Sequence, residues 1–125
     1  MDIRLKRQVN PPLSPPVFYI LLALADRERH GYAIMQEVER RTQDKVRLLP
    51  GSLYSTIKRM LKSGLIEECA GDEVDPHNED ERRRYYRITE SGRAAAKQEI
   101  ERMSTLLDLA GQTELFRSAG EPYHR

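Results

Sequence analysis

The chain has 125 residues, the size of one domain, so two separate cores of ordinary size are not expected. It carries 21 Lys and Arg against 20 Asp and Glu, a net charge of +1, which excludes a polycation that binds nucleic acid through bulk charge. Residues 1–70 nonetheless carry an excess of four positive charges, whereas residues 71–81 carry six acids and no basic side chain. A nucleic-acid site would therefore depend on local clustering of charge.

Apolar spacing and start signals indicate the first two helices. Ser14 and Pro15 predict the start of a helix that is apolar on nearly all sides over residues 17–25, and is therefore buried. Residues 26–31 are expected to form a charged turn. Apolar residues then recur at helical spacing, which predicts a second helix over residues 32–42.

The third helix carries the clearest functional signal. Residues 46–48 are expected to be extended, and Pro50 then starts a helix for which Gly64 supplies the C-terminal cap. Its apolar stripe consists of Leu53, Tyr54, Ile57, Met60 and Leu61. The opposite face holds hydroxyls and cations and no acid: Ser52, Ser55, Thr56, Lys58, Arg59 and Lys62. Such a face suits phosphates and base edges, although a solvated surface helix has a similar composition.

A hairpin and a last helix follow. Residues 65–70 and 84–89 have the composition of two strands, joined by a long charged loop, and Tyr86, in phase with Ile88, is expected to face the core. Thr89 can cap the final helix. In that helix apolar residues step by four and three positions, and this heptad seam predicts contact with another chain: Ala96, Ile100, Met103, Leu107 and Ala110.

This order of elements is that of a winged helix-turn-helix, a mainly α fold with a small β-hairpin and, here, a C-terminal dimerisation helix. Three helices, the third cationic, precede a hairpin whose second strand begins with the arginines at positions 82–84. In that arrangement the third helix enters the major groove and the hairpin reaches phosphates beside it. Tyr54 can pack its ring while its hydroxyl reaches a phosphate or another polar partner.

Little in the chain suggests an enzyme. His30, His77 and His124 lie far apart and are expected to be surface residues rather than metal ligands. Cys69, the only cysteine, is expected to be a small, partly buried side chain, with a reactive thiol as the alternative. No Gly-rich phosphate loop is present, so we expect no catalytic site, no cofactor and no metal.

The expected cellular compartment is inferred from three features that the sequence lacks: a membrane-spanning run, a signal peptide and a pair of cysteines. No apolar run approaches the roughly 18 residues that span a bilayer, and the N-terminus lacks the apolar segment of a signal peptide. A single cysteine fits a reducing compartment. We therefore expect a cytoplasmic protein with no membrane contact.

The combined motifs resemble the PadR family of bacterial transcriptional regulators. The matching pieces cover about residues 13–93 in the family's order: LSPPVFYILLALADRERHGYAIMQEVE from Leu13, LLPGSLYSTIKRMLKSGLIEE from Leu48, and ERRRYYRITESGR from Glu81. The combination of HGY, PGSLY, GLIEE and RRYYRIT is far more specific than any one piece.

This resemblance implies a homodimeric repressor of the family's compact subfamily, bound to a palindromic operator on double-stranded DNA. Ser52, Tyr54 and the polar face that follows match the recognition helix, and Arg83 and Arg84 match the arginines of the wing. Family members often have Arg directly after this Tyr, where Ser55 stands here. A small-molecule inducer of unknown identity is left open.

The expected organisation has four segments: an N-terminal arm (1–12), a DNA-binding domain (13–89), a dimerisation helix (90–110) and a C-terminal tail (111–125). One alternative is a winged-helix module that binds protein instead of DNA. An acidic run favours that alternative because carboxylates repel phosphate: Asp72, Glu73, Asp75, Glu79, Asp80 and Glu81. A small enzyme on the same scaffold is the second alternative, which the lack of a catalytic constellation disfavours.

Overall fold

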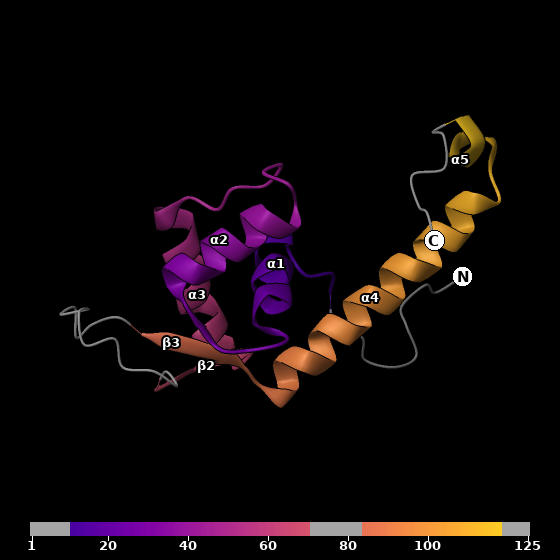
Figure 1. The fold of residues 1–125 in the computed structure, drawn as a ribbon. Helices are drawn as coiled ribbons and strands as arrows, with labels where there is room; N and C mark the ends of the chain where they lie inside the picture. The colour runs from indigo at the N-terminus through magenta and orange to yellow at the C-terminus, as the bar shows by residue number, and fades with distance from the viewer. Residues whose placement is uncertain (1–10, 71–83, 119–125) are drawn as a thin grey trace.

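The computed structural model describes residues 11–70 and 84–118 (Figure 1). Its elements in chain order are α1 (Pro15–Leu24), β1 (Arg29–His30), α2 (Gly31–Arg41), α3 (Pro50–Ser63), β2 (Ile66–Cys69), β3 (Tyr85–Ile88), α4 (Glu90–Gly111) and α5 (Glu114–Ser118). The predictions for most of the N-terminal arm, the acidic run, Arg83, His77 and His124 concern positions outside these described residues.

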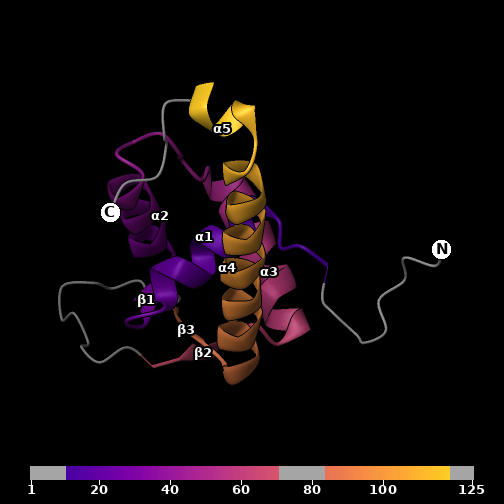
Figure 2. The same cartoon turned by 90° about the vertical axis from the view of Figure 1, so that its right-hand side faces the viewer.

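The predicted mainly helical fold with a small antiparallel sheet is confirmed. Helices α1, α2 and α3 pack together above the sheet, and α4 runs away from them as a single long rod (Figures 1 and 2). The first turns of α4 contact α1 and β3, and α5 folds back against the far end of α4. Three helices and a wing therefore form one body from which α4 projects.

The helix ends follow local chemistry. Prolines occupy the first turns of α1 and α3, where their missing N–H groups cost nothing. Gly64 caps α3 with φ of 81°, a left-handed conformation that favours glycine. His30 caps α2, since its Nδ1 accepts a hydrogen bond of 3.2 Å from the Ala33 amide. Its ring also packs edge-on against Tyr85 at 5.4 Å. His30, expected to be a surface residue, is therefore partly buried and serves as a helix cap.

The sheet has three strands in the order β1-β3-β2, all antiparallel. Tyr86 and Ile88 of β3 are buried, as their spacing predicted, and Ile66 faces the core opposite Ile88. The third strand, β1, was expected to be a charged turn. Arg29 and His30 instead pair with Tyr86 and Tyr85, because the chain between α1 and α2 passes along the free edge of β3.

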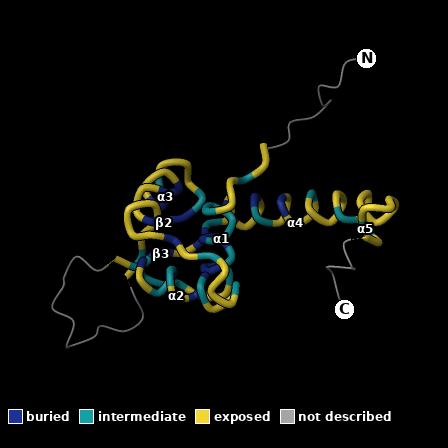
Figure 3. The backbone as a smooth tube through the Cα atoms, turned by 90° about the horizontal axis from the view of Figure 1, so that it is seen from above, coloured by how far each residue is buried: buried dark blue, intermediate teal, exposed yellow. Residues whose placement is uncertain are grey.

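The core lies between α1 and the elements around it. Helix α1 buries Ile20, Leu21, Ala23 and Leu24, which explains why its sequence is apolar on nearly all sides. Figure 3 shows the buried positions concentrated where α1, α3 and the sheet meet. Full burial of one such Leu or Ile contributes about 1.5–3 kcal/mol, so this cluster dominates the stability of the fold.

Two segments lie between or beyond the longer elements. Residues 46–48, expected to be extended, form neither helix nor strand; Leu48 is buried in the core and Val46 packs against it. Thr42 holds this segment, since its hydroxyl accepts a hydrogen bond of 3.1 Å from the Val46 amide. The segment expected to be a C-terminal tail (111–125) contains the short helix α5.

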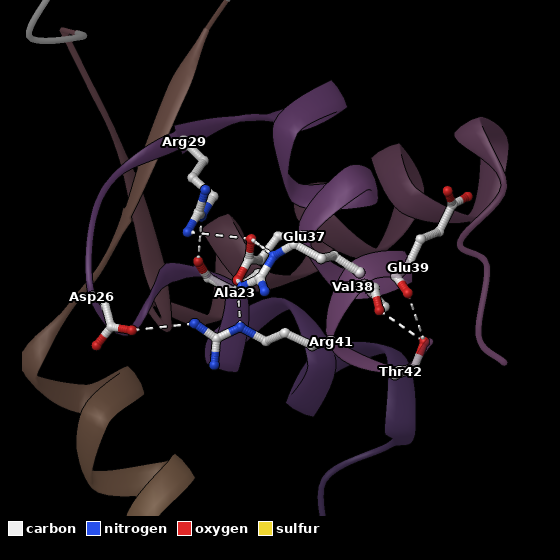
Figure 4. Close-up of polar contacts among 9 residues, drawn as sticks. Ala23, Asp26, Arg29, Glu37, Val38, Glu39, Arg41 and Thr42 are labelled. Atoms are coloured by element: carbon white, nitrogen blue, oxygen red, sulfur yellow. Dashed lines mark hydrogen bonds and ion pairs between the residues drawn. The ribbon is translucent and has the colours of Figure 1, made fainter. Parts of the chain in front are cut away.

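A buried carboxylate joins α2 to α1 and β1 (Figure 4). Glu37 of α2 is 7% exposed and pairs with Arg40 at 2.6 Å, with Arg41, and with Arg29 of β1 at 3.6 Å. Arg29 also donates to the Ala23 carbonyl of α1 at 2.7 Å. The hydrogen bond from Arg40, followed by the hydrogen bond from Arg41 and the charge of Arg29, lowers the pKa of Glu37 to about 2 against the opposing effect of burial.

Glu37→Gln is expected to destabilise the fold by roughly 1–3 kcal/mol at neutral pH, because it breaks charged hydrogen bonds. The unfolded carboxyl takes up a proton below about pH 4.5, whereas the folded one stays ionised down to about pH 2. The stabilisation is therefore complete above pH 4.5 and lost as the pH falls toward 2. Denaturant unfolding at several pH values checks this. The difference in unfolding free energy between wild type and Glu37→Gln should shrink as the pH falls from 4.5 toward 2. An exposed control, Glu101→Gln, should show no such trend.

Candidate nucleic-acid interface

Helix α3 presents one buried and one exposed side. Leu53, Ile57 and Met60 pack into the core, as the apolar stripe predicted, whereas Tyr54, which the stripe also included, is half exposed. The exposed side chains of the opposite face are Ser52, Tyr54, Ser55, Lys58, Arg59 and Lys62. No acid occurs in α3, so this face combines hydroxyls with positive charge. We call these six residues the α3 polar face.

Thr56 does not belong to the α3 polar face. It is buried, and its hydroxyl accepts a hydrogen bond of 3.4 Å from Arg59. Thr56 follows Leu53 by three positions and precedes Met60 by four, which places it on the core side of the helix. The expectation that Thr56 lies on the free face was wrong because it rested on residue type rather than spacing.

Tyr54 connects the polar face to α2. Its side chain is half exposed, and its ring covers Gly31, the first residue of α2. A Cβ added at Gly31 would lie 2.5 Å from the Tyr54 hydroxyl oxygen and 2.8 Å from ring carbons. Glycine is therefore needed at position 31 for Tyr54 to keep this orientation.

The start of α3 is electropositive. Leu49 is the N-terminal flanking residue, and no side chain caps the helix. The first amide N–H groups of a helix point outward and carry partial positive charge, which favours anions nearby. Ser52 and Ser55 lie in this first part of α3, next to those groups, and Lys58 and Lys62 follow along the same helix.

In the wing, exposed arginines pair across the strands. Arg84 lies 3.1 Å from Glu68, and Arg87 lies 2.7 Å from Glu67, with all four side chains partly or largely exposed. Exposed pairs of this kind contribute only about 0–1 kcal/mol. Arg84 is thus held near the strand base by a contact weak enough to be exchanged for a phosphate.

Helix α4 exposes an apolar face. Ile100, Met103 and Ala110 of the predicted seam are exposed, whereas Leu107 is half-buried and Ala96 packs against the core. Leu106 and Leu109, outside the predicted seam, are exposed as well. Where α5 folds back, a groove of ≈ 500 Å³ opens beside Met103, Leu107 and Phe116. We call the exposed side chains Ile100, Met103, Leu106 and Ala110, together with Leu107, the α4 apolar face.

The described residues offer little for other chemistry. Cys69 is partly buried and donates to Glu28 at 3.4 Å, and burial, with the nearby Glu28, raises the pKa of the thiol to about 11. The thiol is therefore protonated at neutral pH. Within residues 11–70 and 84–118, no three His, Cys, Asp or Glu side chains gather closely enough to hold a metal ion. None of the helices described has the apolar length that a membrane crossing requires.

Comparison with known proteins places these features in a family. The model of the "Transcriptional regulator PadR-like family" matches residues 20–98, which include α2, α3 and the wing. A curated relative, the uncharacterized protein X of Lysinibacillus sphaericus, is 36% identical over 75 residues. That match covers 60% of this chain and 65% of the relative, slightly less than two thirds of its length.

Solved structures show the same fold. A transcriptional regulator from Clostridium thermocellum is 27% identical, with a TM-score of 0.65, over 79% of this chain and 89% of that one. A PadR-like transcriptional regulator from Bacillus cereus is 27% identical, with a TM-score of 0.58, over 78% and 92% of the two chains. A PadR family regulator from Clostridium difficile shares the fold at 21% identity, with a TM-score of 0.64, over 79% and 97%.

Proposed function

Because the chain belongs to the PadR-like family of transcriptional regulators, we propose that it acts in the cytoplasm as a homodimeric repressor of a palindromic operator. The observation that carries this proposal is the α3 polar face, an exposed, acid-free surface on the third helix of a winged helix-turn-helix. In this fold the third helix lies in the major groove. The chain is a regulator rather than an enzyme.

The two halves of the α3 polar face have different roles in this proposal. Ser52 and Ser55, at the start of α3, meet base edges and thus contribute to sequence readout. Lys58, Arg59 and Lys62 lie further along and meet the phosphate backbone. Tyr54 contacts a phosphate through its hydroxyl. Arg84 contacts phosphate from the wing, and we extend the same role to Arg83, which lies outside the described residues.

The α4 apolar face supports the dimer. Several large apolar side chains on one helix are exposed to water in the single chain, and a second copy would cover them. A two-fold dimer presents two α3 helices to one side of the duplex, which fits a palindromic site with half-sites about one helical turn apart.

Gel shifts with DNA fragments selected by the purified protein test the proposal. Phosphate neutralisation makes the logarithm of the affinity fall steeply and linearly with the logarithm of the salt concentration. Replacing Lys58 and Lys62 by Ala should weaken binding to operator and random DNA alike and reduce the slope by about one unit per lost contact. Lys97→Ala, an exposed lysine on α4, should leave the slope unchanged.

Two results would count against this assignment. If the lysine variants change base preference instead of overall affinity, the roles of the serines and the lysines are reversed. If the wild-type protein selects no sequence and shows no salt slope, a protein-binding module becomes the better reading of the fold.

Gly31→Ala should displace Tyr54 without unfolding the protein. The Tyr54 ring is half exposed and can swing away from the new methyl group, so the free energy of unfolding should change by less than about 1 kcal/mol. The hydroxyl then leaves its position, and operator affinity should fall about tenfold, equivalent to roughly 1.4 kcal/mol. Binding assays and urea unfolding check both parts. Tyr54→Phe, which keeps the ring and removes the hydroxyl, should show a similar loss of affinity. Full affinity in both variants would exclude Tyr54 from the interface.

A further inference from the structure

A second buried carboxylate marks the point where α4 leaves the body of the protein. Glu99 is 4% exposed and is the last buried residue of α4. Its Oε1 accepts hydrogen bonds from the Leu13 amide at 3.1 Å and from Arg102 Nε at 3.3 Å, and its Oε2 pairs with the second arm of Arg102. Arg102, followed by the Leu13 amide, keeps the pKa of Glu99 below its usual value despite burial. Both carboxylate oxygens therefore have partners.

The contact joins two separate parts of the chain. Leu13 lies two residues before α1 and packs against the core, whereas Glu99 lies near the middle of α4. Closer to its start, α4 is held by Gly92, which packs directly on the Leu65 carbonyl before β2. Gly92 and Glu99, two turns apart, thus attach α4 to two different parts of the body, the segment before β2 and the segment before α1. Beyond Glu99, α4 is mostly exposed and carries the apolar face (Figure 3).

We propose that Glu99 is a positioning residue that fixes the angle between α4 and the DNA-binding body, and so determines which half-site spacing the dimer accepts. The inference rests on the proposed function, because it needs a dimer joined through α4. Helix α4 extends twelve residues past Glu99, or about 18 Å at the usual helical rise. A tilt of about 10° at Glu99 would move the far end by about 3 Å, close to the ~3.4 Å between neighbouring base pairs.

The preferred spacing of the half-sites is therefore a more sensitive measure of the Glu99–Leu13 contact than the affinity for a single operator is. One inserted base pair both separates the half-sites and rotates one of them by about 35° around the duplex. A general loss of stability lowers binding to all operators together, whereas a loosened α4 changes their ranking. The ranking of operators that differ only in spacer length thus separates positioning from a merely structural role.

The experiment compares Glu99→Ala with Glu101→Ala. Both remove one carboxylate from α4, but Glu101 is exposed. Each protein is assayed against the selected operator with its spacer changed one base pair at a time. Wild type and Glu101→Ala should share one sharp optimum, and Glu99→Ala should lose that preference and bind neighbouring spacings comparably. Hydrogen exchange should show the Leu13 amide protected in wild type and Glu101→Ala, and unprotected in Glu99→Ala.

An unchanged spacer profile in a folded, dimeric Glu99→Ala protein would overturn the inference. If that variant does not fold, Glu99→Gln serves instead, because it keeps an acceptor for Leu13 and loses the ionic pairing with Arg102. Its spacer profile should be broader than that of wild type, and an unchanged profile would again overturn the inference. A wild-type protein that is monomeric or binds no DNA would refute the proposed function itself, a result distinct from either.

Discussion

Replacing both Ile100 and Leu107 by Glu is expected to produce monomers that no longer hold operator DNA tightly. Ile100 is half exposed and Leu107 half-buried in the single chain, so covering each contributes about 1–2 kcal/mol, or roughly 4–8 kcal/mol for the four side chains of a dimer. Four carboxylates at the same interface would also repel one another. Because each monomer retains only one α3 helix, the affinity for a two-half-site operator should collapse.

Sedimentation equilibrium and gel shifts with the selected operator check this expectation. Ala94→Glu combined with Thr105→Glu is the matched control, since both residues are exposed and lie on the other side of α4 from the apolar face. That control should remain dimeric and bind normally. If the Ile100 and Leu107 variant remains dimeric, the interface lies elsewhere on the molecule.

Gly92→Ala is expected to cost about 3 kcal/mol or more of unfolding free energy. The new Cβ would lie 2.1 Å from the Leu65 carbonyl oxygen and 2.8 Å from a side-chain carbon of Ile88. The carbonyl cannot move aside easily, because it accepts from the Thr89 amide at 3.1 Å and from the Thr89 hydroxyl at 3.0 Å. The cap of α4 and the edge of the wing would therefore shift together. For a domain of this size, such a loss is a large part of the total stability.

Urea unfolding measures the free energies of unfolding of Gly92→Ala and of a control in the same helix, Gly111→Ala. A Cβ at Gly111 meets nothing within 4 Å, so that substitution should be neutral or stabilise by up to about 1 kcal/mol. Equal stability of Gly92→Ala and wild type would mean that α4 is not seated on Leu65 as described.

Much of the fold could be predicted from the sequence because the relevant signals are local. Pro50 and Gly64 mark the ends of α3, and Thr89 caps α4 through a hydrogen bond of 3.0 Å from the Gly92 amide. Strand β1 could not be predicted. Arg29 and His30 have no strand pattern of their own and become a strand only because β3, more than 50 positions later in the chain, offers them a free edge.

The buried glutamates show a second reason why prediction stops short. Glu37 and Glu99 are each followed three positions later by an arginine, Arg40 and Arg102, and the two glutamates are buried. Glu114 and Arg117 have the same spacing, yet both are exposed. Spacing therefore indicates the ion pair but not its burial, which depends on whether another element packs over it. For Glu99 that element is the segment before α1. In the candidate site, Thr56 was misplaced because its polarity outweighed its spacing.

The order of the sheet has a consequence for how the protein avoids unwanted association. β3 lies between β1 and β2, so the strand with the most apolar inward face is paired on both sides. The outer strand β2 has only four residues, and two of them, Glu67 and Glu68, are exposed acids. Short, charged edge strands are poor templates for adding a foreign strand, and they protect natural sheets against aggregation. The described edge at β2 is therefore poorly suited to pairing with a strand of another molecule.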